Sequence, residues 1–214
     1  MSKKIGILGS GNVGKMLADG FLKLGYGVQI GSRTPDKLNE WLSTAKGDAK
    51  IGTFTDTALF GDVVVLASNW AGTKELIDSV GASAFAGKIV IDVTNPLDFS
   101  TGSPKFSVTL GNSAGEQIQS WLPEAKVVKA FNIVTANYMC NPVLEEGTAD
   151  MFIAGNDAEA KAFVSEIALK WGWGSCSDMG DVSMSYWLET MAMFWIYFGV
   201  INNHWTHAFK LLKK

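Results

Sequence analysis

The fold is decided by one stretch near the start of the chain, Lys4-Ile5-Gly6-Ile7-Leu8-Gly9-Ser10-Gly11-Asn12-Val13-Gly14. Its aliphatic residues 5–8 predict a buried strand, and residues 12–24 predict the helix that follows. Between them the glycines have the spacing G-x-G-x-x-G, which in this context is the fingerprint of a dinucleotide-binding βαβ unit.

Each glycine of this motif has an expected role. Gly9 would make the tight turn, Gly11 would let the backbone approach a pyrophosphate, and Gly14 would let the helix lie close on the strand. The phosphates would face a helix N-terminus, where free N–H groups and the helix dipole favour anions.

The composition is that of a globular chain with a sizeable core. Of 214 residues, 47% are hydrophobic and 18% are charged, and the net charge of −3 favours neither nucleic acid nor an anionic membrane surface as a partner. The longest apolar run, residues 191–201, is short of the ~20 residues that a membrane-spanning helix needs. Cys140 and Cys176 lack metal or redox spacing. We therefore expect a soluble cytoplasmic protein without a metal site.

Strands and helices alternate along most of the chain. After the first unit, strands are expected at residues 28–30, 50–54, 63–67, 89–93, 126–131, 149–154 and 173–177, with helices between most of them. This order predicts an α/β fold, a Rossmann-like, doubly wound and mostly parallel sheet with a small C-terminal helical region. The expected division is a nucleotide-binding domain at residues 1–179 and a helical region at 180–214.

The end of the second strand indicates which dinucleotide is bound. An NAD-binding unit would have an acidic residue here, accepting hydrogen bonds from the ribose 2′-hydroxyl. This chain has Ser32, its only arginine (Arg33), Thr34 and then Lys37. A guanidinium and hydroxyls suit a 2′-phosphate, so the prediction is NADP(H); the alternative is a solvated turn with an unrelated arginine.

Two later strands end in polar residues. Ser68 and Asn69 follow the strand at 63–67, and Asn95 and Pro96 follow the strand at 89–93. Because ligands of open α/β sheets bind beyond the carboxyl ends of the strands, these residues are candidates for contact with the cofactor's ribose and nicotinamide. Ordinary turn chemistry explains any one of them equally well.

The C-terminal region differs from the rest of the chain in its composition. Residues 184–201 are apolar nearly all round, so this helix should be buried against the sheet and against a second subunit, as in a homodimer. Residues 204–214 are expected to form a closing helix. The aromatic side chains could also pack against a planar substrate ring.

Proton-transfer groups are few. The only histidines are His204 and His207, and none of the four tyrosines has a lysine four residues later. Reduction of a ketone or imine needs a proton donor, whereas transfer between two redox cofactors relies mainly on stacking their rings. The sequence therefore favours a coenzyme acceptor and gives no catalytic residue. His204 and Glu189 remain candidate acids, with a plain surface or helix-end position as the alternative.

These motifs together resemble the coenzyme F420-dependent NADP oxidoreductase family. The resemblance is carried by the glycine motif, by Gly31-Ser32-Arg33, and by later blocks: Gly87-Lys88-Ile89-Val90-Ile91-Asp92-Val93-Thr94-Asn95-Pro96, Val127-Val128-Lys129-Ala130-Phe131-Asn132, Phe152-Ile153-Ala154-Gly155, Asp178-Met179-Gly180 and Phe209-Lys210-Leu211-Leu212. Several blocks also resemble the cytosolic reductase domain of the six-transmembrane metalloreductases.

The resemblance implies a Rossmann domain, a helical C-terminal part that joins a dimer, and NADPH as hydride donor. It implies Ser10, Gly11, Asn12 and Val13 at the pyrophosphate, Ser32, Arg33 and Lys37 at the 2′-phosphate, and Val134 and Ala136 beside the nicotinamide. The acceptor would be coenzyme F420 or a flavin. Two alternatives stay open: an NADPH-dependent reductase of a small imine or carbonyl compound, and a non-catalytic module that senses NADP(H).

Overall fold

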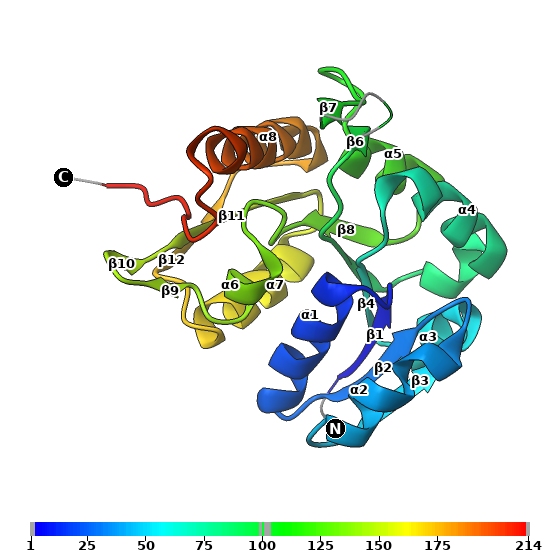
Figure 1. The fold of residues 1–214 in the computed structure, drawn as a ribbon. Coiled ribbons are helices and arrows are strands. Elements are labelled where there is room, and N and C mark those ends of the chain that lie inside the picture. Colours follow the sequence, from blue (N-terminus) through cyan, green and yellow to red (C-terminus); the bar gives the residue numbers. More distant parts are fainter. Residues whose placement is uncertain (1–2, 99, 101–103, 213–214) are drawn as a thin grey trace.

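A computed structural model describes residues 3–98, 100 and 104–212 of the chain (Figure 1). An eight-stranded sheet forms its centre, in the order β12-β11-β8-β5-β4-β1-β2-β3. Neighbouring strands are parallel except β11 and β8. Its strands are β1 (Lys4–Leu8), β2 (Gly27–Gly31), β3 (Ala49–Gly52), β4 (Val63–Leu66), β5 (Ile89–Asp92), β8 (Lys126–Lys129), β11 (Asp150–Gly155) and β12 (Ser175–Asp178). The predicted Rossmann-like, mostly parallel sheet is confirmed.

The helices cover both faces of this sheet. They are α1 (Asn12–Lys23), α2 (Asn39–Thr44), α3 (Phe54–Phe60), α4 (Trp70–Val80), α5 (Ala114–Trp121), α6 (Ala136–Met139), α7 (Ala158–Lys170) and α8 (Ser185–Asn202). In the described part of the chain, short 3-10 turns lie at Pro35–Leu38, Ala82–Phe85 and Val182–Met184. None of the described helices combines the length and hydropathy that a bilayer crossing requires.

The central strand β4 is apolar throughout, because both faces of the sheet are buried there. Successive side chains of a strand point to opposite faces, so Val63 and Val65 of β4 join one core and Val64 and Leu66 join the other. The first core also contains side chains of α1, α7 and α8, and the second contains side chains of α3, α4 and α5. The division of the chain at residues 179 and 180 stays a prediction.

Two small hairpins extend from the main sheet. One pairs β6 (Leu97–Asp98) with β7 (Lys105–Phe106). The other pairs β9 (Val143–Leu144) with β10 (Gly147–Thr148). The first hairpin reaches α8, because Phe106 packs edge-on against Tyr186 and the Tyr197 hydroxyl donates to the Pro104 carbonyl at 2.9 Å.

The predicted closing helix at residues 204–214 is wrong for the described part of that segment. Helix α8 ends at Asn202, Asn203 adopts a left-handed conformation with φ +47°, and residues 204–212 continue without helical structure. The tail forms hydrogen bonds with Asp150 at the start of β11. The Asp150 N–H donates to the Phe209 carbonyl, and the Leu211 N–H donates to Asp150 Oδ2, both at 2.9 Å. These tertiary bonds take backbone groups that a helix would have used.

Candidate functional site

The glycine loop follows β1, and each glycine has a separate physical reason. Gly9 has φ +144°, a conformation that favours glycine, and a Cβ there would collide with the Ala67 carbonyl. A Cβ on Gly14 would collide with the Gly9 carbonyl, so this glycine allows α1 to lie close on the loop. Gly11 faces open space. It is also the N-cap of α1, without a side-chain cap and without an acidic residue in the first turn, which leaves the first N–H groups for an anion.

The loop after β2 combines a buried hydroxyl with exposed cations. Ser32 is buried, and its Oγ accepts hydrogen bonds from the Ser10 hydroxyl at 3.2 Å and the Thr34 N–H at 3.1 Å. Its own proton therefore remains to be donated. Arg33, Thr34 and Lys37 are exposed, and no ion pair of Arg33 occurs within the described residues.

The missing acid at the end of β2 also has a structural reason. Gly31 lies against α3, and a Cβ there would be only 2.9 Å from Thr57 Oγ1. Thr57 is itself held by the buried Gln29 side chain, whose Nε2 donates to it at 3.0 Å. A larger residue at position 31 would have to displace this buried pair, so an aspartate does not fit there.

The residues after β4 line the same edge of the sheet. The Ser68 hydroxyl lies 2.9 Å from Thr73 Oγ1, which donates its proton to the Asn69 carbonyl at 3.0 Å. Ser68 is therefore the donor to Thr73, and it can still accept a hydrogen bond. Asn69 is the exposed N-cap of α4 and makes no side-chain capping bond.

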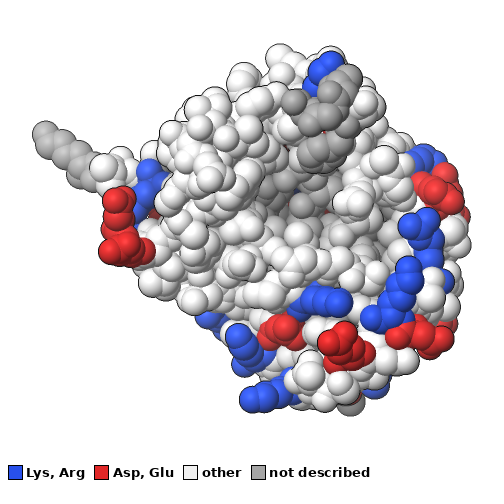
Figure 2. All heavy atoms as spheres, in the orientation of Figure 1, with Lys and Arg blue, Asp and Glu red and all other residues white. Residues whose placement is uncertain are grey.

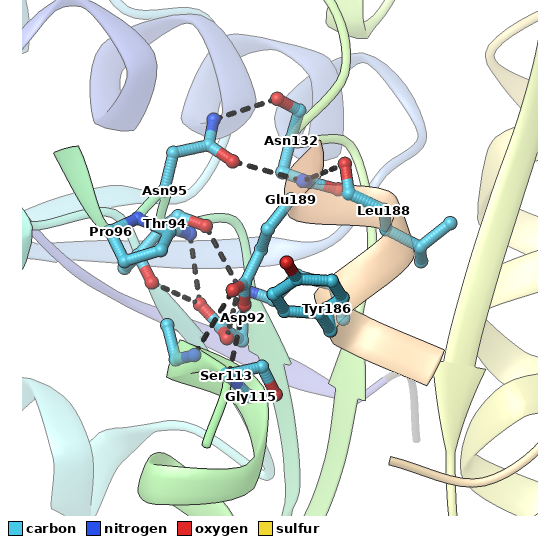
Figure 3. A network of polar contacts seen from close by, with 12 residues as sticks. Asp92, Thr94, Asn95, Pro96, Ser113, Gly115, Asn132, Tyr186, Leu188 and Glu189 are labelled. Atoms are coloured by element: carbon cyan, nitrogen blue, oxygen red, sulfur yellow. Dashed lines mark hydrogen bonds and ion pairs between the residues drawn. The ribbon is translucent and has the colours of Figure 1, made fainter. Parts of the chain in front are cut away.

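The turn after β5 is fixed to the turn after β8 by two asparagines (Figure 3). Asn95 Nδ2 donates to the Asn132 carbonyl at 2.8 Å, and Asn132 Nδ2 donates to Asn95 Oδ1 at 3.0 Å. Asn132 Nδ2 also donates to the Leu188 carbonyl of α8 at 3.1 Å. These contacts join two strand ends and α8, and they place Asn95 and the buried Pro96 at one edge of the sheet.

Phe131, next to Asn132, has an uncommon backbone conformation. Its φ is +60°, although its side chain is fully buried and packs against Trp171 with ring centroids 5.0 Å apart. Its N–H donates to Met151 Sδ at 3.4 Å. Strained residues of this kind persist where packing holds them, often beside functional sites. Val134 and Ala136 follow and are both buried, and Ala136 begins α6, which packs on α1.

A group of charged side chains at this edge was not foreseen. Asp92, Lys129 and Glu189 are all fully buried and form two ion pairs, of 2.6 Å between Lys129 Nζ and Asp92 Oδ2 and 2.8 Å between Lys129 Nζ and Glu189 Oε1. Glu189 therefore occupies neither a surface nor a helix-end position. The signal was present in the sequence, because each of these charges interrupts an apolar run, but the pairing joins residues far apart in the chain.

The two histidines lie in the tail. The His204 ring is exposed and lies 3.1 Å from both the hydroxyl and the carbonyl of Thr206. The His207 ring stacks on Trp195, with its Nε2 3.0 Å from the Trp195 carbonyl, while Trp195 Nε1 donates to the His207 carbonyl at 2.7 Å. Both cysteines are free and partly buried, and burial raises the pKa of the Cys140 thiol to about 12.

Figure 2 shows that the face bearing the strand ends is hollowed near its centre, between α8 and α4. The side chains visible around the hollow are mostly uncharged, and charged ones gather toward the rim of the molecule. The geometry therefore combines a glycine loop with free N–H groups, a loop with exposed basic side chains, and a hollow bordered mostly by uncharged side chains. It defines a dinucleotide-binding protein of the Rossmann class.

Comparisons with known proteins agree with this class. A family model described as NADP oxidoreductase, coenzyme F420-dependent, matches residues 4–96. The F420-dependent NADP reductase of Methanocaldococcus jannaschii is 32% identical over 204 residues, which cover 88% of each chain. The crystal structure of a putative F420-dependent NADP reductase from Arthrobacter sp. FB24 is 34% identical, covers 99% of this chain and 100% of that one, and has a TM-score of 0.94. The chain belongs to the F420-dependent NADP oxidoreductase family and is an NADP-dependent oxidoreductase.

Other proteins are similar to this chain over part of their length or in fold alone. Rat metalloreductase STEAP3 is 30% identical over 190 residues, which span 89% of this chain but only 36% of that protein. A reductive aminase from Aspergillus terreus, solved in complex with NADPH, has a TM-score of 0.68 at 19% identity and shares the fold. The expected likeness to both the F420-dependent enzymes and the metalloreductases is confirmed.

Proposed function

We propose that this protein transfers a hydride between NADP(H) and a flavin-like or deazaflavin coenzyme, such as coenzyme F420. One observation carries this proposal: Asp92 and Lys129, the ionisable residues at the ends of β5 and β8, are fully buried, and Lys129 pairs with both Asp92 and Glu189 of α8. They are held away from any substrate as proton donors. Transfer between two coenzyme rings needs mainly proximity and orientation, which such a site can supply.

The cofactor would lie along the carboxyl edge of the sheet. The pyrophosphate would face the glycine loop, whose residues are Gly9, Ser10, Gly11, Asn12, Val13 and Gly14. The 2′-phosphate would lie among Ser32, Arg33, Thr34 and Lys37. The ribose and nicotinamide would meet Ser68, Asn69, Asn95, Pro96, Val134 and Ala136. The open space at Gly11 and the free proton of Ser32 support the two phosphate positions.

The test is NADPH oxidation with defined acceptors. Purified protein is mixed with NADPH and then with oxidised F420, FMN, FAD or riboflavin, while the nicotinamide absorbance is followed. Loss of that absorbance with F420 or a flavin is expected. Selective binding of NADPH with no oxidation by any of the four would contradict the proposed acceptor class and would favour a sensing module.

A double variant separates this proposal from reduction of an imine or carbonyl compound. Both tail histidines have ring nitrogens near backbone or hydroxyl oxygens of the tail and α8. His204→Ala/His207→Ala should therefore keep hydride transfer to the coenzyme acceptor, whereas an enzyme that took its proton from the tail would lose turnover.

We also propose that α8 forms a homodimer interface. Several large apolar side chains of this helix are exposed, including Phe194 at 65% and Ile201 at 77%, and this is more than a soluble monomer normally leaves in water. Sedimentation equilibrium should give a dimer, and Ile201→Glu should shift it toward monomer. Leu59→Glu, an exposed apolar residue on α3, is the matched control and should leave the dimer intact. A wild-type monomer at micromolar concentration would refute this interface.

A further inference from the structure

The buried charges at the strand ends form one connected group. We call Asp92, Lys129 and Glu189 the ionic cluster. Lys129 Nζ forms ion pairs with Asp92 at 2.6 Å and with Glu189 at 2.8 Å, and it donates a hydrogen bond to the Thr94 carbonyl at 2.8 Å. Two carboxylates and a carbonyl oxygen surround the ammonium group and favour its charged form.

Both carboxylates have the contacts of ionised groups. Asp92 Oδ1 accepts from the Thr94 N–H at 2.8 Å and from its hydroxyl at 2.7 Å. The two Glu189 oxygens accept from the N–H groups of Ala114 and Gly115, each at 3.1 Å, in the first turn of α5. Burial and the neighbouring Asp92 charge raise the pKa of Glu189 above its usual value, while Lys129 and the Ala114 N–H act against that effect. Because each carboxylate accepts two donated hydrogen bonds and lies beside the Lys129 ammonium, we treat the cluster as two anions and one cation.

The surplus negative charge has no second cation beside it among the described contacts. The N-terminus of α5 offsets part of it through the helix dipole, equivalent to about half a unit charge. A net negative charge therefore remains in the protein interior, where screening is weaker than in water.

The position of this charge relates it to the cofactor. Asp92 and Lys129 are the last residues of β5 and β8 and are directly opposite each other in the sheet. Thr94, which the cluster holds through its N–H, hydroxyl and carbonyl, immediately precedes Asn95 and Pro96 (Figure 3). The cluster therefore lies beneath the turn that would border the nicotinamide ring.

We propose that the net negative charge of the ionic cluster stabilises the oxidised nicotinamide relative to the reduced one, and so favours hydride donation from bound NADPH. This inference rests on the cofactor placement given in the proposed function. When NADPH gives its hydride to the acceptor, its nicotinamide ring becomes a cation. A fixed anion nearby favours that product, whereas it has little effect on the neutral reduced ring.

The experiment compares three ligands by titration near pH 8: NADP+, NADPH and 2′,5′-ADP, which lacks the nicotinamide. Glu189→Gln keeps the side-chain shape and removes the surplus charge. It should weaken NADP+ binding about fivefold relative to NADPH, the size expected for one partly screened charge, and should leave 2′,5′-ADP binding unchanged. The control Glu166→Gln makes the same charge change on the exposed face of α7, where Glu166 pairs with Lys170, and should leave the ratio unchanged.

A second variant separates charge from packing. Lys129→Met/Glu189→Gln breaks the ion pairs but leaves Asp92 as the sole charge, so the affinity ratio should return toward the wild-type value. If Glu189→Gln does not fold, Asp92→Asn removes one unit of negative charge from the other side of Lys129. It should likewise weaken NADP+ binding relative to NADPH.

Two results would overturn the proposal: an unchanged NADP+ to NADPH affinity ratio in a folded charge variant, or equal weakening of all three ligands. If neither F420 nor a flavin is the acceptor, NADPH oxidation by these compounds will be absent. The NADP+ to NADPH affinity ratio can still be measured in that case, so the two failures are distinguishable.

Discussion

Replacing Arg33 with alanine tests the assignment of the 2′-phosphate site. The guanidinium follows buried Ser32, is exposed, and forms no ion pair within the described residues. It is therefore available to a phosphate without first leaving another partner. Hydrogen bonds to a charged group contribute about 1.5–3 kcal/mol, and exposure to solvent keeps the total for Arg33 within that range. Arg33→Ala should weaken NADPH binding by about 10- to 100-fold.

The assay is a titration of each variant with NADPH and with NADH. NADH lacks the 2′-phosphate, so its affinity should barely change in Arg33→Ala. Arg33→Lys should keep part of the NADPH affinity, because an ammonium offers the charge without the planar fork. Lys170→Ala, which removes a positive charge from exposed α7, is the control and should change neither affinity.

Salt provides an independent check on the same reasoning. Because the site is exposed, raising the salt concentration should reduce the preference of the wild-type protein for NADPH over NADH. The preference of Arg33→Ala should respond less. Equal losses of NADPH and NADH affinity in Arg33→Ala would refute the placement of this side chain at the 2′-phosphate.

Two further predictions concern the stability of the site. Gly14→Ala should lower the unfolding free energy by about 1–3 kcal/mol because its Cβ would meet the Gly9 carbonyl, whereas Gly11→Ala, which faces open space, should change it by less than about 1 kcal/mol. Thermal and chemical unfolding of both variants check this pair, and equal losses would contradict the packing argument. Burial alone would lower the pKa of Lys129, but Asp92 and Glu189 raise this pKa above 10.5. The contribution of Lys129 to stability should therefore be complete below pH 10.5. It should be lost as the pH rises through the higher folded-state pKa. Urea unfolding from about pH 9 to about pH 12 measures this, and Lys129→Met, which should destabilise the protein by about 3–5 kcal/mol at neutral pH, should lack the alkaline loss.

Much of the fold was predictable because its signals are local. The apolar runs at β1, β4, β5 and β8 indicate strands buried on both faces, and the alternation with helices indicates a doubly wound sheet. Glycine spacing reports backbone conformation directly, so the turn at Gly9 and the close packing at Gly14 could be read from sequence. For the loop at Ser32 and Arg33, the residue types alone predict a phosphate site, and this stays a prediction.

What only the tertiary structure decided involves partners that lie far apart in the chain. A charged residue inside an apolar run must find a counter-charge or stay unpaired at high cost, but the sequence does not say which one. Lys129 finds Asp92 and Glu189, which come from a neighbouring strand and from α8. The tail is a second case in which the partners lie far apart in the chain. Residues 204–212 form hydrogen bonds to the start of β11 and do not form the local helix that the sequence predicts. Local sequence indicates much of the backbone conformation and burial, whereas the pairing of buried charges and backbone groups depends on which segments the fold brings together.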